Sequence, residues 1–63
     1  MLEYFKTILS KVSFDRFLFE KELRKAIRAL VTQELTEFRD WCYSQFGSRY
    51  PIILDNNFNA VAV

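Results

Sequence analysis

Histidine is absent from this 63-residue chain, and glycine, proline and cysteine each occur once. The commonest general base and metal ligand is therefore missing, and one glycine cannot build the glycine-rich loops that cradle phosphates. The lone cysteine, Cys42, cannot form an intramolecular disulfide. We expect a protein that is not an enzyme, holds no metal and no cofactor, and resides in a reducing compartment.

Long apolar runs are also absent, because charged side chains interrupt every hydrophobic stretch. We therefore expect neither a signal-peptide core nor a membrane span, and a soluble, cytoplasmic chain. Charge is nearly balanced, since nine Lys and Arg face eight Asp and Glu and leave a formal net charge of +1. Such a balance gives the whole chain no field that would attract nucleic acid or an anionic membrane.

Hydrophobic residues, by contrast, make up 51% of the chain, and aromatic residues make up 17%. A chain of this size buries only about 60% of the surface that its unfolded form exposes. We expect a single domain over residues 1–63 that gains further burial from a partner. The partner is expected to be a second copy, giving a homodimer or a larger homo-oligomer, or another protein.

Apolar residues recur at helical spacing, every three or four positions, over 2–12, 16–31 and 33–46. This pattern predicts an all-α fold, a small bundle of three helices followed by a short C-terminal helix or extended element. Short loops between consecutive helices favour antiparallel neighbours.

The start of the second helix carries a capping signal. Asp15 is predicted as the N-cap, because its side-chain oxygen can accept a hydrogen bond from the first free backbone N–H groups. Phe14 and Phe19 then occupy the two positions of a hydrophobic staple around that cap.

Neither glycine nor proline lies within 16–46, so the second and third helices could be continuous. Two changes near Thr32 favour a break instead. The apolar stripe moves by about a quarter-turn there, and a new acidic run opens with Glu34. Thr32 is predicted as the N-cap of the third helix.

Gly47 is expected to end the third helix in a left-handed conformation. Pro51 suits the first position of a short fourth helix, although the polar run 55–57 keeps a β-hairpin open as an alternative. Residues 59–63 are expected to fray.

Cys42 and the acidic pair Glu34 and Glu37 are the side chains closest to catalytic chemistry. Cys42 shares helical spacing with Phe38 and Phe46, which predicts a small core residue rather than a nucleophile. The two glutamates open a helix, where negative charge is favourable in itself. Neither feature predicts catalysis.

Four cations share one face of the second helix: Lys21, Arg24, Lys25 and Arg28. They could contact a phosphate backbone, and a small nucleic-acid-binding regulator is therefore the alternative function. The spacing of Glu20 and Arg24 favours an ion pair between them. We prefer a solvated face to a nucleic-acid site.

Four aromatic residues lie on the flanks of the main apolar stripes: Tyr4, Phe17, Trp41 and Tyr43. Aromatic side chains outside a core are typical of protein interfaces. A broad core that absorbs all four is the alternative. The favoured interpretation is a non-enzymatic, self-associating protein–protein interaction module whose interface contains these four residues.

Overall fold

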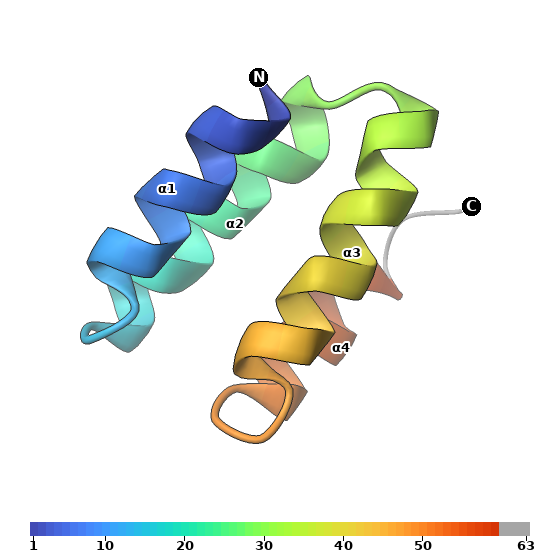
Figure 1. Cartoon of the computed structure of the whole chain (residues 1–63). Helices are drawn as coiled ribbons and strands as arrows, with labels where there is room; N and C mark the ends of the chain where they lie inside the picture. The colour runs from blue at the N-terminus through green and yellow to red at the C-terminus, as the bar shows by residue number, and fades with distance from the viewer. Residues whose placement is uncertain (60–63) are drawn as a thin grey trace.

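The computed structural model describes residues 1–59, and within them every regular element is a helix (Figure 1). The helices are α1 (Leu2–Val12), α2 (Arg16–Ala29), α3 (Thr32–Phe46) and α4 (Pro51–Phe58). The all-α prediction is confirmed. The short C-terminal element is a fourth helix, so the hairpin alternative is wrong. Of the residues 59–63 expected to fray, 60–63 lie outside the described part.

Helix α2 begins as the sequence predicts. The Oδ1 atom of Asp15 accepts hydrogen bonds from the backbone N–H groups of Phe17 and Leu18, at 2.9 and 3.1 Å. The expected staple is not buried on both sides, because Phe19 lies in the core whereas Phe14 is 73% exposed. The cap therefore fixes the start of α2 without the help of Phe14.

The predicted break between the second and third helices is confirmed. Leu30 and Val31 are extended, with φ/ψ of −81°/142° and −74°/162°. The prediction of Thr32 as N-cap is wrong, because Val31 holds that position and Thr32 is the first helical residue. An extended backbone suits a β-branched residue, but the Val31 side chain cannot accept a capping hydrogen bond.

The left-handed conformation predicted for Gly47 is also wrong, since its φ/ψ is −62°/−32°. The need for glycine here is steric. A Cβ atom at this position would collide with the carbonyl oxygen of Tyr43, to which the N–H of Gly47 donates a hydrogen bond of 2.9 Å. The chain then turns, and the N–H of Tyr50 donates to the Phe46 carbonyl at 2.8 Å.

All four helices contribute to one buried apolar cluster. Helix α1 packs mainly on α2, and α4 packs on both α2 and α3. The largest fully buried side chains are Phe19, Phe38, Leu9, Leu23, Leu54 and Cys42. None of the helices in residues 1–59 is long and apolar enough to cross a membrane.

The turn between α1 and α2 and the turn between α3 and α4 lie at the same end of the molecule, opposite the turn between α2 and α3 (Figure 1). The hydroxyl of Tyr50 joins them by donating a 2.5 Å hydrogen bond to the backbone carbonyl of Ser13. The Tyr50 ring also lies against Phe19, at 4.6 Å between centroids. We call the end of the molecule that carries these two turns the turn end.

Candidate functional site

The four aromatic residues predicted as an interface do not form one patch. Tyr4 and Phe17 are 59% and 74% exposed. Tyr4 lies in the first turn of α1 and Phe17 in the first turn of α2, at opposite ends of this antiparallel pair (Figure 1). Trp41 and Tyr43 lie on α3 and are partly buried against the core.

Trp41 and Tyr43 are held by several contacts. The Trp41 ring stacks on Phe38 at 6.1 Å and meets the edge of Phe46 at 5.6 Å. The Tyr43 hydroxyl donates a hydrogen bond of 2.6 Å to Asp55 of α4. That bond, followed by desolvation and the charge of Asp55, raises the pKa of Tyr43 to about 12. Tyr43 therefore connects α3 to α4, whereas the Trp41 ring packs on residues of α3 itself and lies 5.8 Å from the Lys6 ammonium group of α1.

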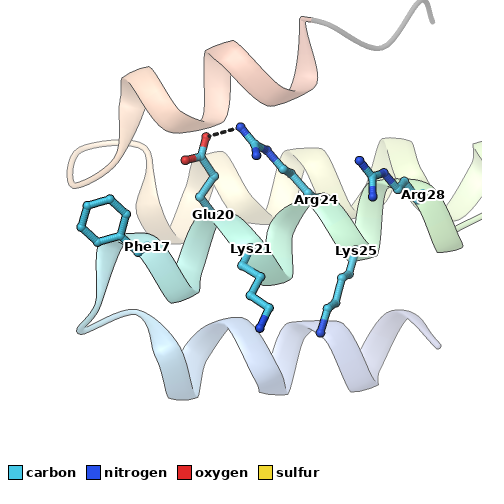
Figure 2. Close-up of a pocket in the computed structure, with 6 residues that line it drawn as sticks. All are labelled: Phe17, Glu20, Lys21, Arg24, Lys25 and Arg28. Atoms are coloured by element: carbon cyan, nitrogen blue, oxygen red, sulfur yellow. Dashed lines mark hydrogen bonds and ion pairs between the residues drawn. The ribbon is translucent and has the colours of Figure 1, made fainter.

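The four cations of α2 do come together. Lys21, Arg24, Lys25 and Arg28 line a shallow depression of about 390 Å³ that also contains Phe17 and Glu20 (Figure 2). Lys21 and Lys25 extend toward α1, whereas Glu20 and Arg24 face α4 (Figure 2).

Two of these cations already have partners. Arg24 Nη2 lies 3.3 Å from Glu20 Oε2, and its Nε donates to Asn57 at 3.0 Å. Lys25 Nζ lies 3.2 Å from Glu22 Oε2. Within residues 1–59, Lys21 and Arg28 form no ion pair. The charge available to an external phosphate therefore comes mainly from Lys21 and Arg28.

Cys42 is buried completely, as its spacing predicts. Burial raises the pKa of its thiol to about 12, against a smaller lowering effect of the Lys6 charge. The thiol is thus protonated at neutral pH, and a nucleophile requires the thiolate.

Sequence reasoning missed a second surface, at the turn end. Phe14 and Ile52 are 73% and 70% exposed, and Phe17 is exposed in the first turn of α2, directly after the turn from α1. A depression of about 340 Å³ lies beside them, lined by Arg16, Arg49, Tyr50, Pro51, Ile52 and Ile53. We call Phe14, Arg16, Phe17, Arg49 and Ile52 the turn-end surface.

This surface combines residues from two turns that are distant in the sequence. One signal for it was present, because short connections between antiparallel helices place the first and third turns at the same end. The identity of the exposed residues there depends on the register of the two helix pairs, which the spacing alone does not give.

Compared with protein-family models, with curated proteins and with solved structures, the chain gives no match. The functional inference therefore rests on the exposed side chains themselves.

Proposed function

We propose that this protein is a non-enzymatic protein–protein interaction module that self-associates into a homodimer or a larger homo-oligomer. The observation that carries the proposal is the exposure of the Tyr4 ring on α1. Large apolar side chains on a small surface favour association, because covering them removes apolar area from water. The proposal also treats residues 1–63 as one domain and its helices as one bundle, because all four helices share one buried cluster.

The flank of α1 supports a symmetric contact. Ile8 is half-buried and follows Tyr4 by one helical turn, so the two side chains lie on neighbouring parts of one face. In a twofold dimer the same patch of each copy covers the other, which buries this strip twice.

Sedimentation velocity over a range of concentrations tests the proposal. We expect a mass above the 7.6 kDa of one chain at tens of micromolar, with dissociation on dilution. Tyr4→Ser should shift the equilibrium toward the monomer, whereas Gln45→Ser, an exposed change on α3, should leave it in place. A monomer of 7.6 kDa at every concentration would refute self-association.

Nucleic-acid binding is the second candidate, and the shared depression of Lys21, Arg24, Lys25 and Arg28 supports it. Replacing the two unpaired cations, Lys21→Gln with Arg28→Gln, should then weaken binding of a duplex and reduce its salt dependence. The matched control replaces Lys11 and Arg39 with Gln, which removes the same charge from α1 and α3. An isotherm that both pairs of changes leave unaltered would eliminate this candidate.

A further inference from the structure

The turn-end surface places apolar and cationic groups side by side. Phe14, Phe17 and Ile52 each leave most of their side chain in water. Arg16 and Arg49 both line the depression between the two turns, together with the partly buried Tyr50 and Ile53. A ligand in this depression would meet an apolar floor and two guanidinium groups.

Both guanidinium groups lie over aromatic rings. The Cζ atom of Arg16 is 5.2 Å from the centroid of Phe17, and that of Arg49 is 5.3 Å from the centroid of Tyr50. Stacking restricts the long arginine side chain while its N–H donors remain directed outward in the guanidinium plane. In the described part of the chain neither arginine forms an ion pair. Two partly ordered, unpaired forks are therefore available to carboxylates.

The charge around these turns is unbalanced. Lys11 of the last turn of α1 adds a third cation, and the carboxylate nearest in sequence to Arg16, that of Asp15, is engaged in capping α2. Two copies that met turn end to turn end would bring arginines against arginines, which is unfavourable. The surface therefore complements a negatively charged partner rather than itself.

We propose that the turn-end surface binds an acidic segment of a partner protein. One large apolar side chain of that segment lies in the depression against Tyr50, Ile52 and Ile53, and carboxylates on either side of it pair with Arg16 and Arg49. The cationic charge is local, because the whole chain carries a formal net charge of only +1, and this favours a short acidic segment over an extended anionic lipid surface. This inference rests on the proposed role as an interaction module, but it does not require self-association.

A random peptide library selected on the immobilised full chain tests the proposal. We expect enrichment of peptides that combine Asp or Glu with Phe, Leu or Trp. The most enriched peptide is then labelled with fluorescein, and its affinity is measured by anisotropy at two salt concentrations. Enrichment of uncharged or basic peptides, or of none, would overturn the proposal.

Matched variants locate the site. The double variant Arg16→Gln with Arg49→Gln should lower the affinity for the labelled peptide at least about tenfold, because each removed ion pair contributes a charge-assisted hydrogen bond. Ile52→Ser, at an exposed position, should also lower the affinity, because it removes apolar contact with the peptide. Arg28→Gln with Arg39→Gln removes the same charge elsewhere and should change affinity less than about twofold, and circular dichroism confirms that each variant folds. Equal affinity of the two double variants for the peptide would overturn the proposal that Arg16 and Arg49 form the binding site.

Two further outcomes are separable from these. If the chain binds vesicles of phosphatidylserine and phosphatidylcholine through Arg16 and Arg49 but binds no acidic peptide, a membrane replaces the protein partner and the proposal is overturned. A monomeric chain that binds the peptide would refute self-association and support the turn-end site. An oligomeric chain that binds no peptide would do the reverse.

Discussion

Phe17 and Phe19 are two positions apart on α2 and belong to two different regions of the molecule. Phe19 is completely buried, with its ring 5.0 Å from Phe46 and 4.6 Å from Tyr50. Phe17 belongs to the turn-end surface and lies beneath the guanidinium of Arg16. The two side chains point about 200° apart around the helix. The phase of the helix, rather than residue type, therefore separates the interior aromatic residues from the exposed ones.

The two regions should respond to different measurements. The interior aromatic residues make their contacts within the chain, so replacing one of them should lower the free energy of unfolding. The turn-end surface has apolar area and guanidinium donors still in water, so its loss appears in binding. Tyr50 belongs to both, because its ring lies against Phe19 and also lines the depression with Arg49.

Replacing Phe19 with Ala should have the largest effect. We expect a loss of about 3–5 kcal/mol in the free energy of unfolding, from lost burial and the cavity left behind. A chain of this length has roughly 3–9 kcal/mol in total, so the loss removes about a third of the stability or more, and urea titration followed by circular dichroism should show a much lower midpoint or an unfolded chain. Phe19→Leu keeps more of the volume and should lose less, which leaves a folded variant for urea titration.

Phe17→Ala is the matched control in the same helix. Its free energy of unfolding should stay within about 0.5 kcal/mol of the original, as is usual for exposed positions, while affinity for an acidic peptide falls. Equal destabilisation by the two alanines would show that Phe17 is part of the core and would remove the distinction between the regions.

Gly47 controls the turn that brings the two regions together. Its replacement by Ala places a methyl group against the Tyr43 carbonyl, and such overpacking costs about 1–3 kcal/mol. Because the turn carries Arg49 and Tyr50, peptide affinity should fall as well. Ser48→Ala, the exposed neighbour, should change neither quantity in urea titration or anisotropy. A Gly47→Ala variant as stable as the original would mean that the turn can shift without cost.

The helices and their order follow from the sequence because apolar spacing and capping are local signals. Asp15, Pro51 and the change of stripe near Thr32 each located a helix boundary to within two residues. The conformation of Gly47 does not follow from the sequence, because the glycine is required by a close carbonyl oxygen, whereas a helix-ending glycine usually indicates a positive φ. The width of the core was also not predictable, since α4 and neighbouring side chains cover parts of Trp41 and Tyr43 that a helical wheel leaves in water.

The turn-end surface was beyond sequence reasoning for a different physical reason. Phe14 and Ile52 belong to two turns that are far apart in the sequence. The hydrogen bond from Tyr50 to Ser13 joins these turns in the fold. The spacing of residues within one helix cannot predict a contact between two turns. The same holds for Asn57 of α4, whose side chain accepts a hydrogen bond from Arg24 and donates one to Glu20. The ion pair between Glu20 and Arg24, by contrast, follows from their spacing in the sequence.

Cys42 gives the interior a pH-dependent signature. Burial raises the pKa of its thiol from 9.0 to about 12 in the folded chain, so the unfolded chain loses the proton first. The stabilisation is therefore fully present below pH 9 and declines as the pH rises from 9 toward 12. By pH 10 the decline should reach about 1.4 kcal/mol.

The measurement is urea titration at pH 8 and pH 10, with Cys42→Ala as the control. The variant should start less stable but lose less between the two pH values, because other groups that titrate there are common to both chains. Parallel declines would contradict burial of the thiol. Replacing Phe17, an exposed aromatic residue, with Ala should leave the loss of stability between pH 8 and pH 10 unchanged.

Among the changes that remove an interior contact, Tyr50→Phe should have the smallest effect, and it separates the roles of the two regions most finely. It removes the hydroxyl that donates to the Ser13 carbonyl at 2.5 Å, which should cost about 1 kcal/mol in urea titration. The ring against Phe19 remains, as does the ring beneath Arg49, so peptide affinity should change only as far as the two turns separate. Tyr4→Phe, at an exposed position, is the control for loss of a hydroxyl and should leave stability unchanged. A large fall in affinity with little fall in stability would show that the hydroxyl contacts the peptide; the reverse would place its whole effect in joining the two turns.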